Sequence, residues 1–243
     1  VVAAETLERA NAPCMFRVHD QPSLEKMEGL RETLASVGIK LAMGQVVRPE
    51  TFQRILERAE SLPEAHMINM SVLRSQAQAE YSPNNIGHFG LALRHYAHFT
   101  SPIRRYSDLL VHRSLIAVLG LGSDGLPPED GDRFSEFGRH LSQTERRAVD
   151  AEREAVDRFT TVFLSDRVGA EFTARVSGTH RAGLFLTLDD SGADGFVPMS
   201  LMGPQQFVYD EPTKTIRARG SKTTYRIGDR VNVVLEEANV HTG

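Results

Sequence analysis

The 243-residue sequence predicts an α+β fold in which a mostly helical part is followed by a small all-β part. Up to about residue 165, apolar residues recur at the three- and four-residue spacing of helices that bury one face. From about residue 168, apolar residues alternate in short runs separated by Gly and Asp, which is typical of a small barrel or sandwich. We therefore expect two domains, residues 1–167 and residues 168–243.

Three helices are predicted in the first 80 residues. The first covers residues 24–36, where Ser23 is a good N-cap and Gly38 stands just past the end, a position that favours glycine. The second and third cover residues 49–59 and 65–79, and each carries apolar residues along one face.

Two loops and one long helix complete the helical part. Residues 82–87 and 120–133 are rich in Gly, Pro, Asn, Asp and Ser, which favours loops. Residues 134–164 predict a long helix whose charges alternate in sign, as on a solvated helix with ion pairs. The strands of the β part are predicted from the alternating residues Phe172, Ala174, Val176, Leu184, Leu186, Leu188, Phe196, Val197, Val231, Val233 and Leu235.

Composition narrows the class of protein. The chain is 40% hydrophobic and 25% charged, as in ordinary soluble globular proteins. Its net charge of −4, taken alone, argues against a nucleic-acid binder, but charges can be segregated on a surface, so the total does not exclude one. The single cysteine, Cys14, excludes an internal disulfide and fits a reducing, cytoplasmic setting. We expect Cys14 to be a small buried residue. We expect no membrane partner, because no apolar run approaches the roughly 18 residues of a membrane span.

Both ends predict a fragment of a longer chain. The sequence opens with Val1 and enters a helical pattern at once. Residues 240–243 follow an alternating strand with no closing element.

One short stretch combines a helix start with two arginines. Thr100 or Ser101 is a good N-cap, and Pro102 suits the first helical position. Arg104 and Arg105 then fall in the first turn, where cations oppose the helix dipole unless an anion lies nearby. Free N–H groups, hydroxyls and two guanidinium groups at one helix start would form a phosphate site.

Other interpretations of this helix remain open. Both arginines could instead pair with Asp108, three and four residues further on. Asp108 and His112 share a helix face, but two ligands are too few for a metal site, and a bracing network with Arg113 is the alternative. An apolar stripe is predicted from Ile103, Tyr106, Leu110 and Leu115.

Four segments resemble signatures of the ribonuclease II / ribonuclease R family, in that family's order. Residues 16–22 read FRVHDQP, residues 87–93 read GHFGLAL, residues 98–113 read HFTSPIRRYSDLLVHR, and residues 144–148 read TERRA. The RRY form and the TERRA segment look closer to ribonuclease R. The resemblance implies that residues 1–167 are the C-terminal part of an RNB catalytic domain.

The resemblance also implies an activity: processive hydrolysis of single-stranded RNA from its 3′ end to nucleoside 5′-monophosphates, with a pair of divalent ions, usually Mg²⁺. The family's essential arginine after Ser-Pro-Ile faces the scissile phosphate and corresponds to Arg104. Thr100, Ser101 and Arg105 would contact the RNA beside it. Glu152 matches a glutamate that reaches the terminal nucleotide, although an exposed helix glutamate is also often merely solvated.

The resemblance places the family's metal-binding carboxylates in an Asp-rich motif upstream of residue 16. Nothing in this chain reproduces that motif, and we assign no metal role to the loop acids Glu129, Asp130, Asp132, Asp189, Asp190 and Asp194. Because a two-metal mechanism requires ligands for both ions, we expect the fragment alone to be inactive. Its necessary partner would be the remainder of the same polypeptide upstream of residue 1.

Residues 183–186 read GLFL, residues 194–200 read DGFVPMS, and residues 225–231 read YRIGDRV. With these pieces, the part of the chain from about residue 168 resembles the OB-type RNA-binding module of ribosomal small-subunit protein one. Phe185 matches a base-stacking position, with a buried core residue as the alternative. Arg181 replaces a common aromatic residue and could itself stack on bases. A basic stretch that could follow the RNA phosphates comprises Lys214, Arg217, Arg219, Lys222 and Arg226.

Two functions from another class compete with the nuclease. The chain could be an RNA-binding module or a scaffold that has no hydrolase activity. The RNA-binding module predicts that RNA affinity depends on residues 169–243 and changes little when Arg104 is replaced. An intact acidic cluster upstream of this sequence would exclude the scaffold.

Overall fold

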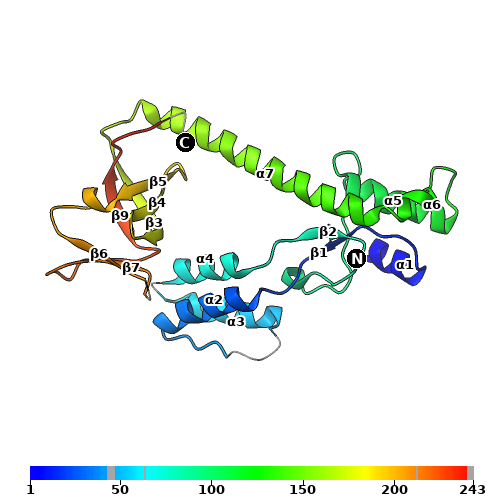
Figure 1. Ribbon diagram of the computed structural model, residues 1–243, viewed down its shortest axis with the longest axis horizontal. Coiled ribbons are helices and arrows are strands. Elements are labelled where there is room, and N and C mark those ends of the chain that lie inside the picture. The colour runs from blue at the N-terminus through cyan, green and yellow to red at the C-terminus, as the bar shows by residue number, and fades with distance from the viewer. Residues whose placement is uncertain (43–46, 63, 212, 240–243) are drawn as a thin grey trace. The chain divides into compact units, whose positions relative to one another are not determined.

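The protein is represented by a computed structural model that describes residues 1–42, 47–62, 64–211 and 213–239 (Figure 1). The chain divides into two compact units. The first unit contains residues 1–28, 43–53 and 75–149, and the second unit contains residues 29–42, 54–74 and 150–243. Residues 240–243, on which part of the expectation of a fragment rests, lie outside the described residues.

The first unit combines helices with one two-stranded sheet. Strand β1 pairs antiparallel with β2, and this register sets Arg17 opposite Tyr81 (Figure 1). The elements that contribute to this unit are α1 (Val2–Arg9), β1 (Phe16–Val18), the start of α2 (Leu24–Ser36), the start of α3 (Pro49–Ala59), β2 (Glu80–Ser82), the 3-10 helix η1 (Phe89–Leu91), α5 (Tyr106–Leu119), α6 (Pro128–Gly131) and the start of α7 (Phe134–Ser165).

The core of the first unit lies between α1, β1, α5 and α7. Leu7, Met15, Leu110 and Phe134 are at most 1% exposed. Cys14 is buried in this core, as the sequence predicts, and burial raises the pKa of its thiol to about 12. The thiol therefore stays protonated at neutral pH and behaves as an apolar side chain.

Helix α7 approaches β2 closely at Gly138. A Cβ atom on Gly138 would lie 2.6 Å from the Tyr81 carbonyl oxygen, so only glycine fits there without a shift. One turn further on, the Ser142 hydroxyl accepts a 2.9 Å hydrogen bond from the Tyr81 backbone N–H and donates a 2.8 Å bond to the Gly138 carbonyl. These contacts hold the backbone of helix α7 directly against the backbone of strand β2.

The helix that follows the Ser-Pro sequence begins later than predicted. Helix α5 starts at Tyr106, with Arg105 as an extended N-cap residue, whereas the N-cap was expected at Thr100 or Ser101. Residues 101–105 form a separate turn, in which the backbone N–H groups of Arg104 and Arg105 both donate to the Ser101 carbonyl.

Asp108 explains the shifted start. Its carboxylate is fully buried and accepts bonds from the Ser101 backbone N–H, the Arg105 guanidinium and the Ser107 hydroxyl, at 2.9–3.1 Å. Burial alone would raise the pKa of Asp108, but these hydrogen bonds outweigh it and the pKa is lowered. The Asp108 carboxylate thus fixes the turn that precedes the helix, and the helix itself begins without a side-chain cap.

The apolar stripe predicted across this helix start is wrong in its first half. Ile103 lies in the turn and is 102% exposed, and Tyr106 is also exposed. Leu110 is buried and Leu115 packs against the core, because these residues lie beyond the true start of the helix.

The second unit consists of helical segments and two sheets. The strand order is β5-β4-β3-β9 in the four-stranded sheet and β6-β7-β8 in the three-stranded sheet, and all pairs are antiparallel. Its elements are the remaining residues of α2, α3 and α7, together with α4 (Ala65–Ser75), β3 (Glu171–His180), β4 (Gly183–Leu188), β5 (Asp194–Pro198), the 3-10 helix η2 (Met199–Leu201), β6 (Phe207–Asp210), β7 (Thr215–Ala218), β8 (Thr224–Tyr225) and β9 (Arg230–Val234).

Alternating residues of β3 and β4 form the core of the second unit. Ala174, Val176, Leu184 and Leu186 are buried, with Leu164 from the end of α7. The register of β3 and β4 shifts between Val176 and Gly178, which marks a bulge. Beside this bulge, Arg74 of α4 donates to the Ser177 carbonyl at 3.2 Å.

The α+β fold predicted from the sequence is confirmed. Helices α2, α3 and α7 match the helices expected at residues 24–36, 49–59 and 134–164. The helix expected at residues 65–79 ends earlier, at Ser75, because the chain then extends into β2, which pairs with β1. The loop expected at residues 120–133 contains the short helix α6. Within the described residues, no helix is both long enough and apolar enough to cross a membrane.

Replacing Gly138 with alanine should destabilise the first unit. The added Cβ must push α7 away from the Tyr81 carbonyl, and we expect a loss of about 1–3 kcal/mol despite alanine's better helix propensity. Gly29→Ala is the matched control, because its Cβ would meet nothing within 4 Å and the substitution should stabilise helix α2. Chemical denaturation of both variants measures the difference. Equal midpoints would contradict the close approach.

Asp108→Asn should destabilise the protein at neutral pH by about 3 kcal/mol, because it removes one partner of a buried ion pair. The lowered pKa of Asp108 contributes stability that is present above the unfolded-state pKa of about 4 and is lost as pH falls through the lower folded-state pKa. The stability gap between wild type and variant should therefore narrow below about pH 4 in denaturation curves recorded across pH. The exposed Asp132→Asn serves as the control, and a gap independent of pH would contradict the assignment.

Candidate functional site

The turn at residues 101–105 presents Arg104 outward. Arg104 and Thr100 are exposed, and no hydrogen bond or ion pair of the Arg104 side chain is found among the described residues. Arg105 instead pairs with Asp108, at 2.9 Å between Nη2 and Oδ2, and the Ser101 backbone N–H is bonded to the same carboxylate. The alternative in which both arginines pair with Asp108 therefore holds for Arg105 only.

The phosphate site predicted from the sequence is thus rearranged. Arg104 and Thr100 remain available to an external ligand, whereas the Arg105 guanidinium is already engaged. His112 does not form the bracing network expected with Asp108 and Arg113. Its Nε2 donates to the Phe99 carbonyl at 2.8 Å, and its ring stacks on Phe99 at 4.2 Å between centroids. Arg113 donates to the carbonyls of Asp124 and Gly125.

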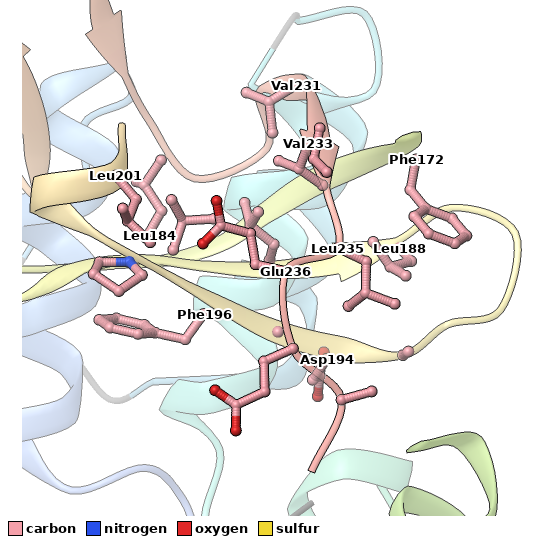
Figure 2. Close-up of a pocket in the computed structure, with 18 of the residues that line it drawn as sticks. Phe172, Leu184, Leu188, Asp194, Phe196, Leu201, Val231, Val233, Leu235 and Glu236 are labelled. Atoms are coloured by element: carbon pink, nitrogen blue, oxygen red, sulfur yellow. The ribbon is translucent and has the colours of Figure 1, made fainter. Parts of the chain in front are cut away.

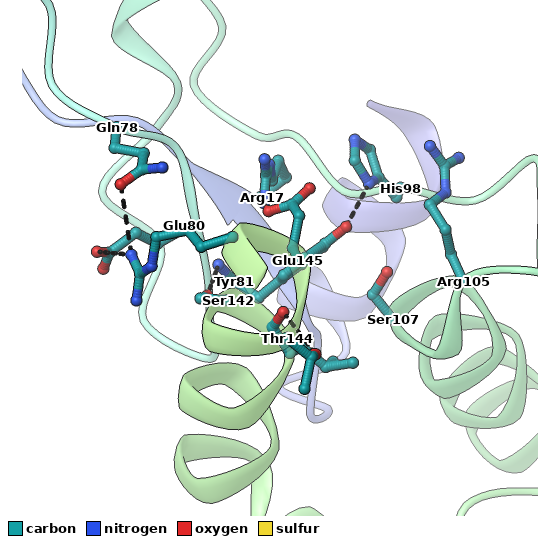
Figure 3. Close-up of polar contacts among 12 residues, drawn as sticks. Arg17, Gln78, Glu80, Tyr81, His98, Arg105, Ser107, Ser142, Thr144 and Glu145 are labelled. Carbon is teal, nitrogen blue, oxygen red and sulfur yellow. Dashed lines mark hydrogen bonds and ion pairs between the residues drawn. The ribbon is translucent and has the colours of Figure 1, made fainter. Parts of the chain in front are cut away.

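A polar network lies beside this turn and joins three of the four signature segments (Figure 3). Arg17 of β1 forms a 2.6 Å ion pair with Glu145 of α7, and only 14% of the Arg17 side chain is exposed. The Arg17 guanidinium stands over the ring of Tyr81, 4.5 Å from its centroid. The Tyr81 hydroxyl shares a 3.0 Å hydrogen bond with Nδ1 of His98. The segments that contain Arg17, His98 and Glu145 therefore meet at Tyr81.

The fourth signature segment is attached through two histidines. The Gly90 backbone N–H donates to His19 Nδ1 at 2.8 Å, so the neutral ring carries its proton on Nε2 and donates to the Ala77 carbonyl. The rings of His19 and His88 lie 5.0 Å apart. Burial, together with His19 and Arg17, lowers the pKa of His88 to about 4. The His88 imidazole therefore acts at neutral pH as an uncharged packing and hydrogen-bonding group.

Sequence reasoning missed most of this network. Arg17, Tyr81, His98 and Glu145 were not among the predicted site residues, although three of them lie within the signature segments. The signal was present only as shared membership of those segments, because Arg17 and Glu145 are 128 residues apart and no local spacing links them.

The second unit presents two adjacent aromatic rings. Phe185 of β4 lies opposite Phe196 of β5, their ring centroids are 5.1 Å apart, and they are 48% and 44% exposed. A Cβ on Gly178 would meet the Phe185 ring at 3.3 Å, so glycine leaves one side of the ring close to the β3 backbone. Phe185 is thus not a buried core residue. Arg181 is exposed in the turn between β3 and β4.

The predicted basic stretch lies on and around the three-stranded sheet. Lys214 and Lys222 are exposed, and Arg219 approaches the Gln206 amide at 3.5 Å. Arg217 forms a 3.3 Å ion pair with Asp210 on the neighbouring strand, which partly neutralises it. The basic surface is therefore weaker than a count of its cations suggests.

A cavity of about 590 Å³ lies on the buried side of the four-stranded sheet (Figure 2). Figure 2 shows that Phe172, Leu184, Leu188, Val233 and Leu235 surround it. The carboxylate of Asp194, which also borders the cavity, is bonded to the Thr187 hydroxyl. The lining combines these apolar side chains with polar residues such as Asp194, Glu236 and Glu237.

Glu152 lies on the part of α7 that belongs to the second unit, whereas Arg104 belongs to the first. Its side chain is exposed, and no hydrogen bond or ion pair of it is found among the described residues. This environment is compatible both with a ligand contact and with simple solvation.

The described residues do not fit a magnesium pair. Across residues 1–42, 47–62, 64–211 and 213–239, no group of three or more His, Cys, Asp or Glu side chains is arranged to hold a metal ion. In the network beside Arg104, Asp108 is occupied by Arg105 and Ser101, and Glu145 by Arg17. We therefore assign no step of a reaction to a metal bound by these residues.

Two domain families match the sequence. Residues 1–120 match the RNB domain, and residues 165–243 match the S1 RNA binding domain. Ribonuclease R of Aquifex aeolicus is 40% identical over 227 residues, which cover 93% of this chain and 32% of that protein. Ribonuclease R of Escherichia coli (strain K12) is 39% identical over 248 residues, which cover 99% of this chain and 30% of that protein. The chain thus spans about a third of the length of these curated relatives.

Solved structures agree with these matches. The apo form of Mycoplasma genitalium RNase R has a TM-score of 0.86 at 27% identity, and the match covers 99% of this chain and 38% of that one. The same enzyme in complex with ribose methylated single-stranded RNA has a TM-score of 0.85 at 27% identity, over 98% of this chain and 38% of that one. Yeast Ssd1, a pseudonuclease, shares the fold, with a TM-score of 0.67 at 20% identity over 88% of this chain and 27% of that one. These matches show that the chain belongs to the ribonuclease II / ribonuclease R family, with RNB sequence over residues 1–120 and S1 sequence over residues 165–243.

Proposed function

We propose that the chain is part of a processive 3′→5′ exoribonuclease that hydrolyses single-stranded RNA to nucleoside 5′-monophosphates. The observation that carries this proposal is the environment of Arg104. Its guanidinium is exposed on a turn fixed by Asp108, while the neighbouring Arg105 is paired. A positioned cation without a partner among the described residues suits a ligand whose negative charge grows during reaction.

Arg104 would act on the scissile phosphate. Charge on the non-bridging oxygens increases as the phosphorus–oxygen bond is attacked, and a guanidinium with two parallel N–H donors stabilises that charge. Thr100 and the Ser101 hydroxyl would contact the same phosphate group, whereas Arg105 would support the turn from behind. Glu152 would contact the terminal nucleotide.

The metal ions, for which we propose Mg²⁺, require ligands outside this sequence. When bound, they would supply Lewis-acid stabilisation of the phosphate and activation of water. This view predicts that the 243-residue chain alone does not hydrolyse RNA and that it works with the remainder of its polypeptide. A cytoplasmic location is part of the proposal and rests on the free thiol of Cys14.

The β part, proposed as the domain of residues 168–243 after a catalytic part of residues 1–167, would hold the RNA strand. The exposed rings of Phe185 and Phe196 offer stacking surfaces for bases. Arg181 lies near the same hairpin, and phosphate contacts would come from Lys214, Arg217, Arg219 and Lys222. RNA binding without hydrolysis remains the second candidate function, because this aromatic pair needs no metal to bind a strand.

Replacing Arg104 tests the proposal. In the chain joined to the remainder of its polypeptide, Arg104→Ala should lower the hydrolysis rate by a factor of about 100–1,000 with Mg²⁺ and single-stranded RNA. The exposed Arg139→Ala removes the same charge from α7 and should leave the rate nearly unchanged. Release of 5′-monophosphates from 3′-end-accessible RNA is the readout, with RNA affinity measured in parallel.

The outcomes separate the two candidate functions. An intact protein that shortens RNA, with a rate that depends on Arg104 but not on Arg139, supports the nuclease. An intact protein that binds RNA without shortening it would replace the nuclease proposal with the binding or scaffold function.

A further inference from the structure

We propose that Tyr81 and His98 are positioning residues for Arg104, an inference that rests on the proposed function. The hydrogen bond between them would fix the extended segment that leads into the Arg104 turn. Neither residue contacts the scissile phosphate in this view. Both act through the backbone of residues 98–104.

The segment before Arg104 is held at successive points. The Tyr96 carbonyl accepts a 2.9 Å bond from the Arg17 backbone N–H, and the Phe99 carbonyl accepts a 2.8 Å bond from His112 Nε2. Between these two backbone anchors, the His98 side chain reaches β2 through the Tyr81 hydroxyl at 3.0 Å. The next anchor is the Ser101 N–H on Asp108, where the turn itself begins.

Tyr81 is a rigid anchor for this contact. It is 8% exposed, and its backbone N–H is bonded to Ser142 on α7. Its ring lies under the Arg17 guanidinium, which Glu145 holds in turn at 2.6 Å. Figure 3 shows His98 next to this group, with Arg105 on its other side. The Tyr81 hydroxyl therefore has little freedom to follow a displaced His98.

The charges around His98 favour the neutral ring. Burial lowers the pKa of His98, and the nearby guanidinium groups of Arg105 and Arg17 lower it further, against smaller opposing effects of Asp108 and Glu145. At neutral pH, Nδ1 of the uncharged His98 ring forms one hydrogen bond with the Tyr81 hydroxyl. Tyr81→Phe would remove that bond and keep the ring beneath Arg17.

A displaced turn would affect the chemical step more than RNA binding. Arg104 is proposed to act on charge that develops in the transition state, and a misplacement of about 1 Å strongly lowers the rate of such a step. Most of the RNA contacts proposed above lie in the β part. Loss of the Tyr81–His98 bond should therefore lower kcat while KM for RNA changes little.

The test uses the chain joined to the remainder of its polypeptide, with Mg²⁺ and single-stranded RNA as substrate. Tyr81→Phe and His98→Leu should each lower kcat about tenfold, with KM within about twofold of wild type. His98→Asn should restore most of kcat, because an amide group can occupy the position of Nδ1 and bond to the Tyr81 hydroxyl.

Tyr96→Phe is the matched control. It deletes a hydroxyl from the same ring cluster, and the Tyr96 hydroxyl has no hydrogen bond within the described part of the chain. This variant should retain wild-type kcat.

Combining Tyr81→Phe with Arg104→Ala separates positioning from general stability. If Tyr81 acts through Arg104, the double variant should be no slower than Arg104→Ala alone. Losses that add in the double variant would overturn the proposal, as would equal kcat values for Tyr81→Phe and Tyr96→Phe. If Tyr81→Phe fails to fold, equal kcat values of His98→Asn and His98→Leu would overturn it instead. A wild-type protein without nuclease activity would overturn the proposed function itself, and this inference with it.

Discussion

The first unit depends on the close approach of helix α7 to strand β2 at Gly138. Because Gly138 has no side chain, the Tyr81 carbonyl oxygen can lie 2.6 Å from the position that a Cβ atom would occupy. Ser142 can then bond to the Tyr81 backbone, and Glu145, one turn further along the same helix, reaches Arg17. A single glycine thus allows two signature segments, far apart in the sequence, to share one polar network.

The arginines in and beside this network are of two kinds, paired and unpaired within the described residues. Arg17 and Arg105 are mostly removed from water, and each is paired with a carboxylate that is itself hydrogen-bonded or partly buried. A charge buried without such a partner would destabilise the fold by several kcal/mol. Arg104 is exposed and bears no such constraint. The pairing of its neighbours therefore fixes the turn and leaves one guanidinium for a ligand.

Local sequence signals predicted the elements, and long-range contacts determined the site. The periods of residues 24–36, 49–59 and 134–164 gave helices that the structure confirms, because each period reflects one buried face. The start of α5 was predicted wrongly, because the buried Asp108 holds Ser101 and Arg105 in a separate turn before the helix, which local preferences do not reveal. The Tyr81–His98 and Arg17–Glu145 contacts arise from strand pairing and helix packing, which periodicity does not encode. The roles of Glu152 and Phe185 stay predictions.

The central claim is that the network on β2 and α7 holds the segment that presents Arg104. Amide hydrogen exchange in a Glu145→Gln variant tests this claim most directly. The account predicts faster exchange at the amides of Arg17, Ser101, Arg104 and Arg105, whose hydrogen bonds define that segment, with unchanged exchange in α1. Faster exchange confined to α7, with residues 96–105 protected as in the wild type, would contradict it.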